Sequence, residues 1–222
     1  MRAQIIQNVP EMNSEMAEVN RRIINEAGVL TVVLAGLPGC GKTSLLHATI
    51  QRMHDRKVGV IVGGYLNMND VQTFATTADQ FAHVNVASAW QLGPHHVHQA
   101  IKSLELKSLD MLLIETAAGA LCPGIADLGQ HLNVGVFSVS AGDDQALKEQ
   151  DLVRQSALLL LTKADLLPYT AFDVNLLRIQ LQTSRPTVRL MEISVRDASG
   201  LYPWTSWLES NIVSRFGLEG VV

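Results

Sequence analysis

The stretch "GLPGCGKT", residues 36–43, constrains the fold more than any other part of this chain. It matches the pattern G-x-x-x-x-G-K-S/T, follows the apolar run "VLTVVLAG" (29–36) and precedes a helix-periodic stretch over 42–54. Glycines let such a loop curl until its backbone N–H groups point at phosphate oxygens, and the next helix adds its positive end. A glycine-rich turn with a chance lysine is the alternative. The flanking strand and helix patterns favour a phosphate-binding loop.

The residues of this loop and of the helix start form the expected phosphate site. Lys42 is expected to reach the β- and γ-phosphates and the Thr43 hydroxyl to ligate Mg²⁺, so both have catalytic roles. Cys40 is interpreted as a small filler rather than a ligand. The expected nucleotide contacts on this side are Gly36, Pro38, Gly39, Cys40, Gly41, Lys42, Thr43 and Ser44.

Short apolar runs alternate with helix-periodic stretches along the rest of the chain. Buried strands that alternate with helices are typical of right-handed βαβ units. We therefore expect an α/β fold of the P-loop NTPase class: a mostly parallel sheet of about seven strands with helices on both faces. One domain is expected over 1–222, with a leading helical segment over 1–27 whose helix is capped by Ser14. Expected strands are 29–36, 58–64, 81–87, 111–117, 134–142, 157–165 and 188–195, and expected helices are 14–26, 42–54, 95–107, 173–182 and 203–214.

Composition limits the kinds of partner. The 222 residues are 47% hydrophobic and carry a net charge of −4, which allows a large core and argues against a protein that mainly binds nucleic acid. No apolar run is long enough to span a membrane, and Cys40 and Cys122 are too few for a disulfide framework. We expect a cytoplasmic protein with neither nucleic acid nor membrane as a partner.

The stretch "LLLLTKAD" ends an apolar run with Thr162, Lys163 and Asp165. A carboxylate at such a strand end can accept hydrogen bonds from the N1–H and the exocyclic amine of guanine, a pair of donors that adenine lacks. Downstream, "EISVRDASGL" places Ser194 and Val195 where a backbone N–H could meet the guanine O6. A solvated Lys-x-Asp turn is the alternative interpretation. The combined pattern favours GTP and GDP as the bound nucleotides.

Several longer stretches resemble the HypB family, the nickel-inserting GTPases of nickel–iron hydrogenase maturation. They are "NSEMAEVNRRIINEAGVLTVVLAGLPGCGKTSLL", "ETAAGALCPGIADLG", "SVSAGDDQALK" and "LLLTKADLLPYTAFDV", and the likeness extends over nearly the whole chain. The resemblance implies a guanine-nucleotide-binding metallochaperone that couples GTP binding and hydrolysis to nickel delivery during maturation of hydrogenase or a related metalloenzyme. It further implies Glu115 as a catalytic carboxylate, a homodimer, and a metalloenzyme precursor or accessory maturation proteins as partners.

The same resemblance implies a metal site. The setting "LCPGIADLG" gives Cys122 the role of a metal ligand, and "HHVH" occupies the place of an adjacent Cys-His pair in the family. Alignment gives His95 and His96 as the other ligands, while a shift of one residue, which would bring in His98, stays open. Imidazole and thiolate donors suit Ni²⁺ or Zn²⁺. The alternative is that the histidines are exposed residues at a helix start and Cys122 a buried filler.

The chain departs from the family at three positions near the expected γ-phosphate. Tyr65 and Met68 stand where the family has an aspartate and a threonine, and Ala118 replaces a glycine after Glu115. A neutral phenol is a poor partner for Mg²⁺, so we expect nucleotide binding to be retained and hydrolysis to be slow. The alternative function is therefore a hydrolysis-deficient nucleotide-binding scaffold or regulator of HypB descent without a physiological metal. The T-K-A-D ending disfavours an ATP-dependent small-molecule kinase.

Overall fold

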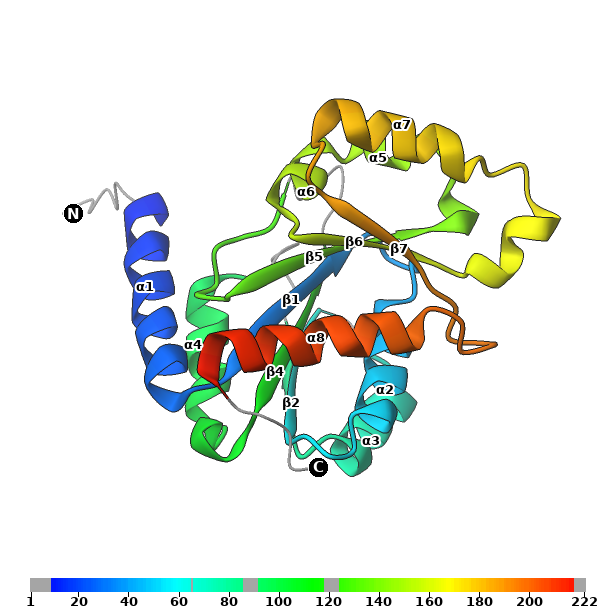
Figure 1. Cartoon of the computed structure of the whole chain (residues 1–222). Coiled ribbons are helices and arrows are strands. Elements are labelled where there is room, and N and C mark those ends of the chain that lie inside the picture. The colour runs from blue at the N-terminus through cyan, green and yellow to red at the C-terminus, as the bar shows by residue number, and fades with distance from the viewer. Residues whose placement is uncertain (1–8, 65, 86–91, 118–123, 218–222) are drawn as a thin grey trace.

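A computed structural model describes residues 9–64, 66–85, 92–117 and 124–217 of the chain. Within these residues seven strands form one sheet in the order β3-β2-β4-β1-β5-β6-β7, and every pairing is parallel (Figure 1). This confirms the expected α/β class and the expected number of strands. The strands are β1 (Leu30–Gly36), β2 (Val58–Gly63), β3 (Gln80–Val84), β4 (Met111–Ala117), β5 (Leu132–Ser138), β6 (Leu158–Thr162) and β7 (Arg189–Glu192).

Helices cover both faces of this sheet, as expected. Side chains of α1, α4, α6 and α7 pack into the core on one face, and those of α2, α3 and α8 pack into the core on the other. The α-helices are α1 (Val9–Ala27), α2 (Lys42–Arg52), α3 (Met68–Thr77), α4 (Pro94–Lys102), α5 (Gln145–Lys148), α6 (Gln150–Gln155), α7 (Val174–Ser184) and α8 (Leu201–Phe216). Three 3₁₀ helices are η1 (Leu106–Ser108), η2 (Val139–Ala141) and η3 (Ala164–Tyr169).

The central strand β1 shows why the strands of this sheet are apolar at nearly every position. Val33 and Ala35 belong to the core on one face, whereas Val32 and Leu34 belong to the core on the other. All seven residues of β1 are buried, since successive side chains point to opposite faces and helices cover both. The alternation of polar and apolar residues that marks a half-exposed strand is therefore missing.

The helix boundaries correct several expectations. Helix α1 begins at Val9, so Ser14 lies inside the helix and does not cap it. Helix α4 begins at Pro94, a residue that suits a first turn because its missing N–H needs no partner there, and it ends at Lys102 instead of continuing to residue 107. Helices α3, α5 and α6 were not expected, because their short apolar patterns do not stand out from the surrounding sequence.

The carboxyl ends of the strands form the edge of the sheet that matters for function. Because all strands are parallel, the loop after β1, the turn after β6 and the segment after β7 emerge on the same edge. Strand β1 lies between β4 and β5, so connections diverge there to both sides, and ligands of open parallel sheets bind at such a point. The phosphate loop starts here.

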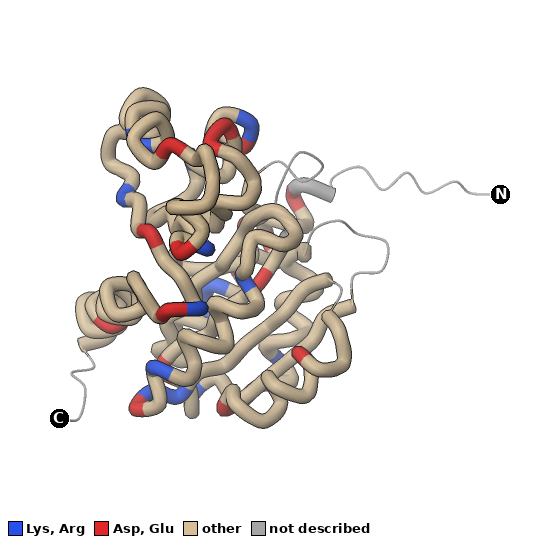
Figure 2. Tube along the Cα trace, turned by 90° about the vertical axis from the view of Figure 1, so that its right-hand side faces the viewer, with Lys and Arg blue, Asp and Glu red and all other residues tan. Residues whose placement is uncertain are grey.

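The distribution of charged residues and the length of the helices bear on the kinds of partner expected from the sequence. In the view of Figure 2, acidic and basic residues are interspersed along the part of the chain that the structure describes. None of the described helices is both long enough and apolar enough to cross a bilayer.

Candidate functional site: a nucleotide edge and a histidine turn

The loop between β1 and α2 depends on its glycines, as Gly36 and Gly41 show. A Cβ at Gly36 would lie 2.2 Å from the carbonyl oxygen of Val136, so only glycine allows this close approach of backbone. Gly41 has φ 90°, in the left-handed region, and its carbonyl accepts the first helical hydrogen bond of α2 from Leu45. The loop thus curls as its glycines predict. Its exposed residues are Pro38, Gly39 and Ser44.

Lys42 lies buried inside this loop rather than extending into solvent. Its Nζ donates to the carbonyl oxygens of Gly36 at 2.9 Å and Leu37 at 3.1 Å, and lies 3.7 Å from the Cys40 Sγ. Cys40 is 2% exposed, and burial raises the pKa of its thiol. A buried, neutral thiol suits the expected role of filler. The lysine ammonium is held at the inner wall of the loop, where phosphates would lie.

The Thr43 hydroxyl and the Glu115 carboxylate meet across the edge of the sheet. The Thr43 Oγ1 donates to the two carboxylate oxygens of Glu115 at 2.9 and 3.1 Å. Burial raises the pKa of Glu115, Lys42 opposes that shift, and the charge of Asp70 on α3 adds to it. Hydroxyl and carboxylate oxygens are the donors that Mg²⁺ prefers, so this pair fits the cation that accompanies a nucleoside triphosphate.

The three departures near the γ-phosphate have different outcomes. Tyr65 and Ala118 lie outside the described residues. Met68 is 69% exposed at the start of α3, where the Asn67 side chain caps the helix by accepting from the Asp70 amide. Met68 therefore offers an apolar, solvent-facing side chain in the segment where the family has a hydroxyl.

Thr162 and Lys163 connect the turn after β6 to the phosphate loop. The Thr162 Oγ1 is 2.5 Å from the carbonyl oxygen of Cys40 and 2.9 Å from that of Phe137, and Thr162 is buried. The Lys163 Nζ donates to the Gly39 carbonyl at 2.9 Å. Both side chains thus hold the phosphate loop and the turn after β6 together. We call these two segments at the carboxyl ends of the strands, residues 36–43 and 162–165, the nucleotide edge. This arrangement assigns them a positioning role, whereas Asp165 of the same turn lines the adjacent cleft.

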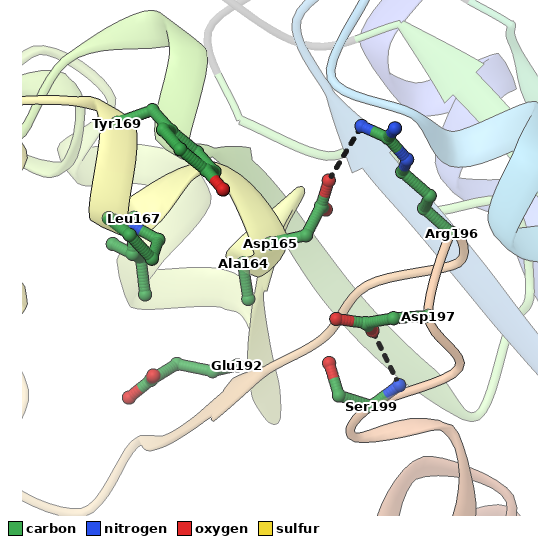
Figure 3. A pocket seen from close by; sticks show the side chains of 9 residues that line it. Ala164, Asp165, Leu167, Tyr169, Glu192, Arg196, Asp197 and Ser199 are labelled. Atoms are coloured by element: carbon green, nitrogen blue, oxygen red, sulfur yellow. Dashed lines mark hydrogen bonds and ion pairs between the residues drawn. The ribbon is translucent and has the colours of Figure 1, made fainter.

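Asp165 lies in a cleft of about 700 Å³ between η3 and the segment after β7 (Figure 3). The Ser194 Oγ donates to the Asp165 Oδ1 at 2.7 Å, and Ser194 is fully buried. The Arg196 guanidinium lies 3.9 Å from the Asp165 Oδ2. The carboxylate is therefore fixed in orientation at the cleft wall. The cleft is lined by Ala164, Asp165, Leu167, Pro168, Tyr169, Glu192, Arg196, Asp197 and Ser199.

One expected base contact differs from the geometry. The Ser194 N–H donates to the carbonyl oxygen of Ser199 at 2.9 Å, so this amide is already engaged. Of the two amides expected near the guanine O6, that of Val195 remains the candidate. Val195 is 37% exposed. The closure of this loop on Ser199 could not be seen from the S-x-R pattern.

The three clustered histidines at the start of α4 have three different environments. His95 is exposed. The Nδ1 of His96 accepts a hydrogen bond from the Gly93 amide at 3.2 Å, which caps the helix. The Nδ1 of His98 lies 2.9 Å from the Asn20 Oδ1 on α1. Burial lowers the pKa of His98, and Lys102 and His95 lower it further, so the neutral ring is favoured.

The rest of the expected metal site lies beyond what the structure describes. Cys122 falls in the segment 118–123, outside the described residues. Among the residues that are described, no three histidine, cysteine or acidic side chains come together in a way that could hold a metal ion. The described part of the chain thus supplies imidazoles from α4, and any third protein ligand has to come from elsewhere.

Asn20 is the residue that the sequence reasoning overlooked. It is 0% exposed, and its Nδ2 donates to the carbonyl oxygens of Pro94 at 2.9 Å and Leu128 at 3.1 Å. Next to it, the Nη2 of Arg21 donates to both carboxylate oxygens of Asp127. Asn20 thereby joins α1 to the first turns of α4, residues 93–98, which we call the histidine turn, and to the segment that follows residue 123. The signal available in the sequence was an asparagine at helical spacing between the apolar residues Ala17 and Ile24.

Fold and loop together define the class of protein. A parallel sheet with a phosphate loop after β1 and the T-K-A-D turn after β6 is the framework of a P-loop nucleotide-binding protein. Residues 30–192 match the family model "CobW/HypB/UreG, nucleotide-binding domain". The hydrogenase maturation factor HypB of Rhizobium leguminosarum bv. viciae is 31% identical over 96% of this chain and 71% of its own length. The chain therefore belongs to the CobW/HypB/UreG family, and within it to the HypB proteins.

Solved structures agree with this placement. The crystal structure of HypB from Archaeoglobus fulgidus superposes with a TM-score of 0.85 at 26% identity, over 91% of this chain and 99% of that one. HypB from Helicobacter pylori, solved in complex with nickel, superposes with a TM-score of 0.86 over 92% of this chain and 97% of that one; at 21% identity this likeness supports the fold alone.

Proposed function

We propose that this chain is a guanine-nucleotide-binding metallochaperone that couples GTP binding and slow hydrolysis to the delivery of Ni²⁺ to a hydrogenase or related metalloenzyme precursor. The observation that carries the nucleotide part is the Asp165 carboxylate, which Ser194 fixes at the wall of the cleft between η3 and the segment after β7. A fixed carboxylate selects for guanine, because adenine has no matching pair of donors.

The residues at the edge of the sheet divide the work of phosphate chemistry. Lys42 would exchange its loop carbonyls for the β- and γ-phosphate oxygens. Thr43 and Glu115, already in contact, would hold Mg²⁺ and its water shell. When bound, Mg²⁺ neutralises charge that develops on the phosphates during transfer. Because Tyr65 and Met68 stand where the family has an aspartate and a threonine, we expect fewer than about one turnover per minute.

Nickel enters the proposal through the family and the histidine turn. The similar HypB from Helicobacter pylori was solved with nickel, and this chain presents His95, His96 and His98 on the first turns of α4. Together with Cys122, they offer the nitrogen and sulfur donors that bind Ni²⁺ or Zn²⁺. A homodimer and contacts with accessory maturation proteins belong to the same proposal.

The proposal is tested by GTP turnover with and without one equivalent of Ni²⁺ or Zn²⁺, alongside calorimetry with GDP and ADP. We expect GDP to bind at least tenfold more tightly than ADP, a difference of about 1.4 kcal/mol, and metal to change the rate of turnover. Equal affinities for GDP and ADP would contradict the role of Asp165. Unaltered turnover together with undetectable metal binding would contradict the chaperone function.

A second function is favoured by the exposed Met68 and by Tyr65, the replacements of an expected threonine and aspartate. In that case the chain is a nucleotide-binding scaffold or regulator that hydrolyses GTP negligibly and carries no physiological metal. The double variant Tyr65→Asp with Met68→Thr separates the two. A severalfold gain in turnover without tighter GDP binding supports a weakened GTPase, since groups that act in the transition state change the rate rather than ground-state affinity.

A further inference from the structure

The hydrogen bond that caps α4 determines which nitrogen of His96 carries its proton. The donor is the Gly93 amide and the acceptor is the His96 Nδ1. A ring nitrogen that accepts a hydrogen bond carries no proton, so in the neutral ring the proton of His96 is on Nε2. Neither nitrogen then has a lone pair available for a metal, unless His96 gives up the cap.

The opposite tautomer is imposed on His98. The Asn20 amide is oriented by two backbone carbonyls, those of Pro94 and Leu128, which both accept from its Nδ2. Its Oδ1 is therefore the atom that faces the His98 Nδ1, and an amide oxygen can only accept. The His98 proton is on Nδ1, and its Nε2 carries a free lone pair. This is the arrangement that metal-binding histidines have, with the second nitrogen bonded to an oxygen acceptor.

We infer that the imidazole pair of α4 that binds the cargo metal is His95 with His98, and that His96 is a helix cap and not a ligand. This inference rests on the proposed function, because it assigns ligands within the proposed metal site. Residues three apart lie on the same helical face, whereas the adjacent pair His95 and His96 diverge around the axis. A borderline divalent cation, Ni²⁺ or Zn²⁺, is the ligand class that two neutral imidazoles select.

Matched glutamine variants separate the two histidines. Glutamine at position 96 keeps the cap, since a glutamine at this place in the first turn can reach back to the same amide, and it removes only the imidazole. Glutamine at position 98 can still donate to the Asn20 Oδ1. We therefore expect His98→Gln in the full chain to weaken Ni²⁺ binding at least tenfold by calorimetry. His96→Gln should stay within twofold of the wild type, as should His54→Gln, a change at an exposed histidine.

The outcomes distinguish this assignment from the proposed function. If His96→Gln loses Ni²⁺ affinity and His98→Gln keeps it, the assignment is wrong while the chaperone function stands. If the wild type binds no Ni²⁺ at micromolar concentration, both are overturned. Unchanged GDP affinity in each variant shows that the chain is folded and that the loss is confined to the metal site.

A second measurement needs neither a variant nor a metal. Long-range ¹H–¹⁵N correlation spectra of the imidazole rings report which nitrogen is protonated. We expect the Nδ1–H tautomer for His98 and the Nε2–H tautomer for His96 at pH 7.5. The reverse pattern, or the same tautomer in both rings, would overturn the assignment regardless of how any variant behaves.

Discussion

The phosphate loop and the histidine turn both sit at the beginning of a helix, yet they are held in different ways. The loop before α2 is shaped by its own glycines, and Lys42 bonds to carbonyls five and six residues away. The turn at the start of α4 is held in place by α1. Asn20, which lies 74 and 78 residues earlier in the chain, forms hydrogen bonds with Pro94 and His98. The curl of the phosphate loop is encoded by its own glycines and is braced from outside by Thr162 and Lys163, whereas the orientation of the histidine side chains depends on a different helix.

The difference shows what each site can tolerate. A site built from backbone amides and glycine conformations survives changes in distant helices, since its donors belong to the loop itself. A site whose tautomers and orientations are set by a neighbouring helix is lost when that helix shifts. Substitutions in α1 should therefore affect the histidine turn and leave the nucleotide edge intact.

The largest expected effect concerns the phosphate loop. Lys42→Ala should weaken a non-hydrolysable GTP analogue about 100-fold, or about 2.7 kcal/mol, and GDP clearly less, because the ammonium lies nearest the terminal phosphates. Calorimetry with both nucleotides measures it. The control is Lys57→Ala. This exposed lysine pairs with Asp79 and lies at the amino end of β2, away from the expected nucleotide site. Equal losses for the two nucleotides would place Lys42 away from the γ-phosphate.

The next largest effect concerns the histidine turn, whose orientation depends on α1. Asn20→Ala removes the hydrogen bonds of a fully buried amide and should lower the free energy of unfolding by about 2 kcal/mol in urea titrations. The affinity of the folded variant for GDP should stay within about twofold of wild type. Asn69→Ala, on the exposed first turn of α3, is the matched control and should cost under about 0.5 kcal/mol. If Asn20→Ala weakened GDP binding well beyond twofold, the nucleotide edge would depend on α1 as well, and the distinction between the two sites would be wrong.

Acid should act on the α1 side through His131, which accepts from the Thr31 amide and bonds to Asn25 at the end of α1. Burial, aided by Arg215 and Arg21, lowers the pKa of His131 from 6.5 to about 4. The folded state thus favours the neutral ring, and this stabilisation is complete above pH 6.5 and is lost as pH falls toward 4. Linkage alone would make the wild type lose about 2 kcal/mol more than His131→Gln between pH 7 and 5, and solvent screening of this partly exposed ring reduces the expected difference in urea unfolding to about 1 kcal/mol. Parallel pH profiles would rule out this contribution.

The smallest expected effect has the opposite sign. The raised pKa of Glu115 means that its ionised form is disfavoured in the folded protein without nucleotide. The cost is absent below the ordinary value of 4.5 and appears as pH rises through the folded pKa. Glu115→Gln should therefore stabilise the apoprotein by about 0.5 to 1 kcal/mol at pH 7, and turnover should fall. The gain should disappear at pH 4, and a gain that persists there would point to packing instead.

The same comparison explains what the sequence could and could not reveal. The sheet, the phosphate loop and the T-K-A-D turn could be predicted, since apolar runs and glycine spacing encode them locally. The ligand choice among His95, His96 and His98 could not, because it depends on which atoms of Asn20 and Gly93 face the rings. The engaged amide of Ser194 was equally hidden, as its acceptor, Ser199, lies in an irregular loop. Short α3 escaped prediction because it buries a single residue, Phe74.

The long-range bonds of Asn20 also bear on the order in which the chain folds during synthesis. Helix α1 is made first, but the two carbonyls that Asn20 requires come 74 and 108 residues later. Domains are made from the N-terminus at about 5–20 residues per second, and contacts of such separation form late. Until Leu128 has emerged, α1 has no complete docking site and its apolar side, including Ile24, stays open to chaperones or proteases. Nascent chains that stop before residue 128 should therefore be cut within α1, while longer ones resist.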